Sequence, residues 1–191
     1  AGPSCSGKTT LAQHLADALG SPVRPVPLDG YFMPQLMPTH PEYGMNWEMP
    51  SGVDFARLRE DLRNIKSTLA SAEALPQTIV TSGNPRRGGG DVLRKHLAGQ
   101  PLGTDTVVVV AEGFLLFYDP LLARMFDAGI WLDADCATCC RRRHLRDARD
   151  VDVDQYSQWF QGLVWSHFEE YKEAQLANLP VAQRLDATLV P

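Results

Sequence analysis

The sequence lacks a long hydrophobic run, an excess of positive charge and a second group of cysteines, and each absence excludes a class of protein. None of its apolar runs approaches the roughly 20 residues that a membrane-spanning helix requires. A net charge of −5 argues against a general nucleic-acid-binding protein. The motif Asn-Lys-x-Asp, which a guanine-reading switch protein would need, does not occur in the 191 residues. We therefore expect neither a membrane partner nor a nucleic-acid partner.

Cysteine is scarce, and its distribution argues against a structural zinc site. Three of the four cysteines lie together in the run CATCC, residues 136–140. Structural zinc generally needs a second ligand pair, and no matching Cys/His pair is evident elsewhere in the sequence. We expect reduced thiols at the start of a helix, as in a cytoplasmic protein. With 44% apolar and 21% charged residues, the chain is typical of one globular domain spanning residues 1–191.

The clearest motif lies at residues 2–9, where GPSCSGKT fits G-x-x-x-x-G-K-[ST]. In this loop, backbone N–H groups surround nucleotide phosphates, the lysine contacts the β- and γ-phosphates, and the hydroxyl binds Mg²⁺. Leu11, Leu15 and Leu19 follow at helical spacing, and the positive end of that helix favours the same phosphates. A simple Gly/Ser-rich helix cap is the less favoured interpretation. The residues expected to bind ATP are Gly2, Ser4, Cys5, Ser6, Gly7, Lys8, Thr9 and Thr10.

Strand and helix patterns alternate after this loop. The run TVVVVAEG at 106–113 predicts a strand buried on both faces, as in a parallel sheet. Further strands are predicted at 23–29, 77–82 and 129–135. The pattern indicates an α/β three-layer P-loop NTPase fold with a mainly parallel central sheet and helices on both faces. Because a phosphate loop normally follows a buried strand and only Ala1 precedes this one, we expect that first strand to be missing from the chain.

Helices and loops complete the predicted domain. Asp54 is expected to cap an amphipathic helix, and a long helix is predicted from about 153 to 176. The proline-rich segment at about 30–53 is predicted to be an irregular, functional loop. The segment at about 84–104 fits no motif.

Two carboxylates follow predicted strands at the sheet edge where ligands bind in such folds. Glu112 closes VVVVAE beside Gly113 and is predicted to reach Mg²⁺ through water; the alternative is a strand-end cap. Asp29 closes VPLD and can orient an acceptor hydroxyl and take its proton, although Asp-Gly is also a common turn.

Five arginines lie within the nine residues RRRHLRDAR. Arg142, Arg143 and Arg146 can share a helix face, and guanidinium groups match phosphate oxygens. A solvated basic helix is the alternative interpretation. In a chain with a phosphate loop, we favour an arginine-rich lid over about 141–153.

Aromatic residues are concentrated in the proline-rich loop. Tyr31, Phe32 and Trp47 can stack on a flat heterocycle, and Glu48 can bind sugar hydroxyls. Packing of these rings back onto the domain is equally compatible with the sequence.

These segments together resemble one family, the nucleoside kinases that include the uridine-cytidine kinases and the nicotinamide riboside kinases. The phosphate loop is similar, LDGYF resembles the motif that carries the catalytic Asp, and NWEMPSGVD resembles a substrate motif. EGFLLF and WFQGLVWSHFEEYKE resemble the riboside-kinase forms, and CCRRRHLR resembles the arginine lid. The resemblance covers most of residues 2–176.

The resemblance implies ATP-dependent phosphorylation of a nucleoside 5′-hydroxyl, with Mg²⁺. Asp29 would be the base, Lys8 would hold phosphates, and Thr9 would ligate Mg²⁺ with Glu112 and Asp29 reaching it through water. The residues expected to flank or hold the nucleoside are Asp29, Tyr31, Phe32, Trp47, Glu48 and Glu112, and those expected to close over the transferred phosphate are Arg142, Arg143 and Arg146.

The substrate is predicted to be nicotinamide riboside, which would be converted to nicotinamide mononucleotide in NAD biosynthesis. Met49 stands where the uridine-kinase motif has His, whereas LRDARD is closer to the uridine-kinase lid. Gly30 departs from the Ser or Asp of the family motif, and Glu48 replaces an Asp. Uridine or cytidine, or an ATP-binding relative without activity, remain the alternatives.

Overall fold

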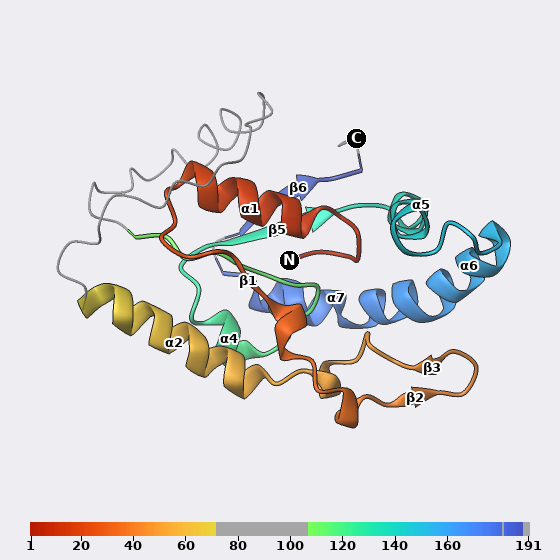
Figure 1. Cartoon of the computed structure of the whole chain (residues 1–191), viewed down its shortest axis with the longest axis horizontal. Helices are drawn as coiled ribbons and strands as arrows, with labels where there is room; N and C mark the ends of the chain where they lie inside the picture. The colour runs from red at the N-terminus through yellow and green to blue at the C-terminus, as the bar shows by residue number, and fades with distance from the viewer. Residues whose placement is uncertain (72–106, 181, 189–191) are drawn as a thin grey trace.

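Parallel strand pairs and surrounding helices form a mixed α/β unit in the computed structural model, which describes residues 1–71, 107–180 and 182–188 (Figure 1). The strand predicted at 77–82 and the segment at about 84–104 lie outside the described residues. None of the helices among the described residues has the length and apolar character that crossing a membrane would require.

Two parallel pairs carry the site. Strand β1 (Val26–Pro27) pairs with β4 (Ala111–Glu112), and β5 (Gly129–Asp133) pairs with β6 (Ala182–Asp186). Ala1 lies along β5, since its amino group donates to Ile130 O at 2.7 Å and its carbonyl accepts from Leu132 N at 2.8 Å. The phosphate loop therefore begins at the side of β5.

The valine run departs from its prediction. The strand in this run is short: β4 covers only Ala111–Glu112. One further backbone hydrogen bond joins Val26 N to Val110 O. Burial on both faces was wrong for Val107, which is 47% exposed. The partner strand explains the short ladder, since Pro25 and Pro27 have no N–H to donate and β1 gives way to a 3-10 turn at Leu28–Tyr31.

Helices occur at each place where the sequence predicts one within the described residues, and the short helix at Pro120–Ala123 was not predicted. These are α1 (Lys8–Ala18), α2 (Phe55–Ser71), α4 (Pro120–Ala123), α5 (Cys136–Asp147), α6 (Val153–Trp159) and α7 (Ser166–Asn178). The Asp54 cap is confirmed, because its Oδ1 accepts from Arg57 N at 2.9 Å. The cysteines of CATCC are free thiols in the first turns of α5, as predicted.

A π-helical segment, Phe160–Trp165, interrupts the long helix that was predicted as one element and joins α6 to α7. The proline-rich loop runs past this helix and contains two 3-10 turns, Pro34–Leu36 and Pro50–Gly52, and a small antiparallel hairpin, β2 (Thr39–His40) with β3 (Gly44–Met45). Figure 1 shows the hairpin alongside the helical stretch formed by α6 and α7.

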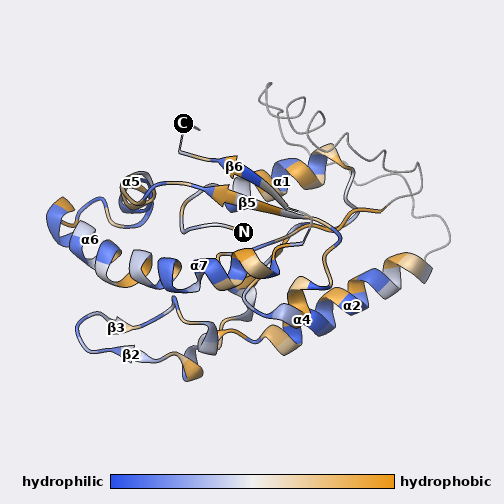
Figure 2. Ribbon diagram, turned by 180° about the vertical axis from the view of Figure 1, so that it is seen from behind, coloured by the Kyte–Doolittle hydropathy of each residue, from blue (hydrophilic) through white to orange (hydrophobic). Residues whose placement is uncertain are grey.

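The main core lies between the strands, α2 and α7. Leu28, Leu58, Leu115 and Trp131 are each no more than 1% exposed within it. Figure 2 shows hydrophobic residues along β5 and alternating hydrophobic and hydrophilic patches along α2, as expected of a half-buried helix. A second cluster joins α5 to α6 and the π-helical segment through Cys139, Tyr156, Phe160 and Val164.

Candidate active site

Backbone geometry gives the loop at residues 2–7 its tight curvature. Gly2, Cys5 and Gly7 have positive φ angles of 141°, 58° and 96°. A side chain at Gly2 would collide with the carbonyl oxygen of Leu132, so the loop lies directly against β5. Gly7 is the N-cap of α1, and this left-handed conformation is open to glycine at little cost. The loop therefore turns sharply into the N-terminus of a helix, where backbone N–H groups favour anions.

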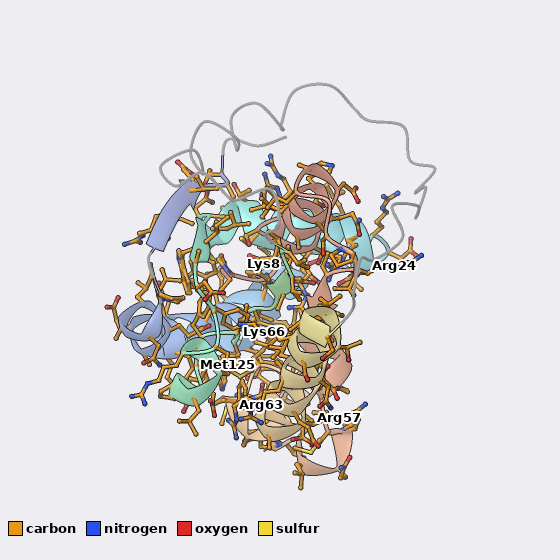
Figure 3. All side chains as sticks on the ribbon, turned by 90° about the vertical axis from the view of Figure 1, so that its left-hand side faces the viewer. Lys8, Arg24, Arg57, Arg63, Lys66 and Met125 are labelled. Atoms are coloured by element: carbon orange, nitrogen blue, oxygen red, sulfur yellow. The ribbon has the colours of Figure 1, made fainter. Side chains whose placement is uncertain are left out.

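Lys8 folds over this loop. Its Nζ donates to Pro3 O at 2.6 Å, and Figure 3 labels the residue near the middle of the view, whereas the labels of Arg24 and Arg57 lie toward the edge. Burial lowers the pKa of Lys8 from its ordinary value of 10.5, and the nearby carboxylates of Glu112 and Asp29 act in the opposite direction. A half-buried cation that lines the cleft favours a bound anion.

Thr9 and Glu112 meet across the base of the cleft. Thr9 Oγ1 donates to Glu112 Oε1 at 3.0 Å, which joins the first turn of α1 to the end of β4. Glu112 is 9% exposed. The next residue is Gly113, and a Cβ at this position would overlap the Leu28 side chain, so the close packing there requires glycine. The two hard oxygen donors therefore lie side by side at the phosphate loop, as the motifs predicted.

Asp29 lies in the 3-10 turn that follows β1 and faces the same cleft as Lys8. Its neighbour Leu28 is fully buried and anchors the turn. Asp29 itself is exposed, so its carboxylate is open to a ligand.

A single cleft of about 490 Å³ collects most of the predicted site residues. Its lining consists of Ser4, Cys5, Gly7, Lys8, Thr9, Thr10, Asp29, Phe32, Trp47, Glu48, Glu112, Phe114, Arg142, Arg143 and Arg146. Gly2, Ser6 and Tyr31 are absent from that lining. Gly2 and Ser6 are buried beneath the loop surface.

Tyr31 lies against α2 instead. Its hydroxyl donates to Asp61 Oδ2 at 2.9 Å, and the Arg57 guanidinium lies 5.5 Å from its ring centre. Desolvation and the bond to Asp61 raise the pKa of Tyr31. The stacking role predicted for it has no counterpart in these contacts.

Three aromatic rings form one end of the cleft. Phe32 and Trp47 meet edge to face with centroids 5.7 Å apart, and Phe32 and Phe114 are 5.9 Å apart. Trp47 is 41% exposed and so presents ring surface to a ligand. Phe114 was missed by the sequence analysis; its signal was its position two residues after the strand-end carboxylate, within EGFLLF.

Glu48 and Arg143 pair beside these rings. Arg143 Nη1 donates to Glu48 Oε1 at 3.2 Å and to Ser4 Oγ at 3.1 Å, and its guanidinium lies 5.2 Å from the centre of the Trp159 ring. Glu48 is 6% exposed. Burial raises the pKa of Glu48 and the Arg143 charge lowers it. Arg143 thus links the phosphate loop, the proline-rich loop and α6.

The other two predicted arginines also line the cleft, and both have partners. Arg142 Nη1 donates to Ala187 O at 3.0 Å, just beyond β6. Arg146 forms a two-point contact with Asp147, with Nε–Oδ1 and Nη2–Oδ2 distances of 2.6 and 2.8 Å. All three arginines therefore come from α5 and line the cleft, and Arg143 contacts the phosphate loop through Ser4.

Curated proteins of similar sequence carry the names of nucleoside kinases. No protein-family model matches the chain. It is 28% identical to the nicotinamide riboside kinase of Eremothecium gossypii, over 97% of this chain and 79% of that protein. It is 27% identical to nicotinamide riboside kinase 2 of Homo sapiens, over 93% of this chain and 67% of that protein.

Uridine kinases align at similar identity. The uridine kinase of Shewanella denitrificans is 24% identical over 91% of this chain and 81% of its own length. The resemblance predicted from the motifs is thereby confirmed: over most of its length, the chain is similar in sequence to the nicotinamide riboside kinases and the uridine kinases.

Proposed function

We propose that this protein transfers the γ-phosphate of ATP to the 5′-hydroxyl of nicotinamide riboside, giving nicotinamide mononucleotide. The observation that carries the proposal is the shared cleft: the phosphate loop, the carboxylate of Asp29 and the aromatic end with Glu48 all line one space of about 490 Å³. A triphosphate and an acceptor alcohol can therefore meet between Lys8 and Asp29.

The phosphate end of the cleft fits a nucleotide with Mg²⁺. Thr9 Oγ1 and Glu112 Oε1 are oxygen donors 3.0 Å apart, as a hard cation prefers. Thr9 would ligate the ion and Glu112 and Asp29 would reach it through water, and the ion would supply charge neutralisation at the transferring phosphate. Lys8 and the loop N–H groups would hold the phosphate oxygens.

In the proposed reaction, Asp29 accepts the proton of the 5′-hydroxyl while that oxygen attacks the γ-phosphorus. The new P–O bond forms as the bond to the leaving ADP oxygen breaks, so the phosphate changes acceptor and the proton goes to Asp29. Arg142, Arg143 and Arg146 stabilise the negative charge that spreads over the phosphoryl oxygens. The helix that carries them would close over the transferred phosphate as a lid in a three-layer P-loop fold.

The aromatic end favours nicotinamide riboside. Its pyridinium ring is flat and positively charged, and such a ring is attracted to aromatic faces like those of Phe32, Trp47 and Phe114. Glu48 would accept from the ribose hydroxyls. Met49 supplies no strong hydrogen-bonding group for a uracil edge, since its Sδ is a weak acceptor and already accepts from Tyr171 Oη at 3.2 Å.

Uridine or cytidine is the second candidate substrate, because uridine kinases align with this chain at identities close to those of the riboside kinases and because LRDARD resembles their lid. The test is a steady-state phosphorylation assay with nicotinamide riboside, uridine and cytidine, each with ATP and Mg²⁺. We expect kcat/KM for nicotinamide riboside to exceed the others at least tenfold. A preference for a pyrimidine nucleoside would replace the proposed substrate, and no transfer to any of the three would reject the kinase proposal.

A further inference from the structure

The strongest unexplained feature outside the residues already assigned is a chain of hydrogen bonds that ends at the backbone of Glu48. Glu48 N donates to Asn46 Oδ1 at 3.0 Å. Asn46 Nδ2 lies 3.1 Å from His167 Nε2, and His167 Nδ1 lies 2.7 Å from Leu163 O. The chain therefore connects the proline-rich loop to the π-helical segment at Phe160–Trp165.

Each donor in this chain has a matching acceptor in one arrangement only. Leu163 O can only accept, so His167 Nδ1 donates to it; Asn46 Oδ1 accepts from Glu48 N, so Asn46 Nδ2 faces His167 Nε2, which accepts. Asn46 donates to it through Nδ2, so its Oδ1 is turned toward the Glu48 N–H. The ring of His167 thus fixes which way the Asn46 amide faces, and that amide holds the backbone of Glu48.

The π-helical segment places this contact in line with two others. In a π-helical turn the backbone hydrogen bond joins residues five apart, so residues four or five apart lie near one face, whereas in an α-helix residues three or four apart do so. Gly162 and His167 are five apart across the π-helical segment, and His167 and Tyr171 are four apart in α7. The three residues therefore share one face of the long helix.

The proline-rich loop contacts that face through three residues spaced three apart, Tyr43, Asn46 and Met49. A Cβ at Gly162 would lie 3.1 Å from Tyr43 Oη, so the Tyr43 ring approaches the helix closely there. Asn46 meets His167, and Met49 Sδ accepts from Tyr171 Oη. Trp47 and Glu48 lie between Asn46 and Met49 in the chain and face the cleft.

Asn46 is 4% exposed, so the amide that holds Glu48 is shielded from water. A buried polar group that loses its hydrogen-bond partner costs more free energy than an exposed one, so removing either side chain should be unfavourable. We infer that Asn46 and His167 are positioning residues that hold Glu48 for the nucleoside, and that the π-helical segment aligns them. This inference rests on the proposed nucleoside-kinase function.

The test combines kinetics with backbone hydrogen exchange in four variants of the full chain. His167→Ala and Asn46→Ala remove the contact, His167→Gln retains a side-chain acceptor, and His14→Ala is the matched control on the exposed face of α1. For the first two we expect the nucleoside KM to rise about tenfold, the scale of one lost buried hydrogen bond, while the ATP KM changes less than twofold. His167→Gln should restore the nucleoside KM to within about threefold.

The Glu48 amide gives a readout that does not depend on turnover. Its exchange, followed by NMR, should accelerate about tenfold in His167→Ala and Asn46→Ala but not in His14→Ala. An unchanged nucleoside KM, equal rises in both KM values, or unchanged amide exchange in folded His167→Ala or Asn46→Ala would overturn the inference. If the wild-type chain phosphorylates no nucleoside, the proposed function fails, and the amide exchange still decides whether these residues hold Glu48.

Discussion

Removing the positive partner of Glu48 tests the electrostatic design of the cleft directly. Glu48 is 6% exposed, and its ion pair with Arg143 has an Nη1–Oε1 distance of 3.2 Å. Arg143→Met keeps most of the side-chain stem and removes the charge, so the Glu48 carboxylate would remain buried without its guanidinium. Such an orphaned charge is among the most destabilising results of a single substitution.

The expected loss follows from the burial of the pair. Breaking a fully buried ion pair from one side costs about 3–5 kcal/mol. The Arg143 side chain is 19% exposed and that of Glu48 8%, so we expect somewhat less, about 2–3 kcal/mol in the free energy of unfolding. For a chain of this size the midpoint of thermal unfolding should fall by roughly 5–10 °C.

A double-mutant cycle isolates the pair from the other contacts of Arg143. Arg143→Met, Glu48→Gln and the double variant would be unfolded in urea without ligands, and we expect Arg143→Met/Glu48→Gln to be more stable than Arg143→Met alone. A coupling energy of about 1–2 kcal/mol is expected. If the double variant is as unstable as the sum of the two single variants, Glu48 carries no buried charge that Arg143 compensates, and the reasoning is refuted.

The pH dependence of the same variant has a definite sign. Burial raises the pKa of Glu48 above its ordinary 4.5, so in the native state this carboxyl binds its proton more readily than in the unfolded chain. The stability contributed by this group therefore falls as pH rises from the unfolded-state pKa of 4.5 through the higher native pKa. It is recovered as pH falls back toward 4.5. Arg143→Met removes a charge that lowers the pKa, so its deficit against the wild type should shrink on acidification; a deficit that grows would contradict the assignment.

Three further predictions concern the phosphate loop and the nucleoside end. Lys8→Ala and Asp29→Asn should each reduce kcat at least a hundredfold, but only Lys8→Ala should weaken ATP binding strongly by calorimetry; near-normal turnover in Asp29→Asn would remove the base from the mechanism. Trp47→Ala should raise the nucleoside KM about tenfold and leave ATP affinity within twofold, whereas equal effects would reject a stacking role. Because Cys5 has a φ of 58°, Cys5→Gly should be more stable than Cys5→Ala by about 1 kcal/mol in urea unfolding, and equal stabilities would show that the loop backbone relaxes.

Elements encoded by local patterns were predictable from the sequence. The phosphate loop and α1 follow from glycine spacing and a leucine stripe, and α2 begins at the Asp54 cap that the sequence indicated. Strand β5 is an apolar run, and it was predicted because burial of both faces leaves a signal within a few residues. The valine run carries the same signal, yet Val107 is exposed, since the extent of a strand depends on its partner and β1 is limited by prolines.

Contacts between distant segments left no such signal. Glu48 and Arg143 are 95 residues apart, and nothing in either local sequence indicates that they pair. Tyr31 lies next to a motif residue in the chain, but its ring turns to α2 because Asp61 and Arg57 offer partners there. The aromatic character of the loop was predictable, whereas the choice between ligand and core for each ring depended on tertiary packing.

Most residues of the site could be recognised in the sequence, but their alignment could not, and the π-helical segment shows why. Residues 153–178 have the composition of one helix, and an uninterrupted α-helix would place Gly162 and His167 on different faces. One π-helical turn brings them onto the same face, where the proline-rich loop meets them through Tyr43 and Asn46. The direction in which Glu48 faces thus depends on a local change of helical pitch, which a pattern of apolar positions does not record.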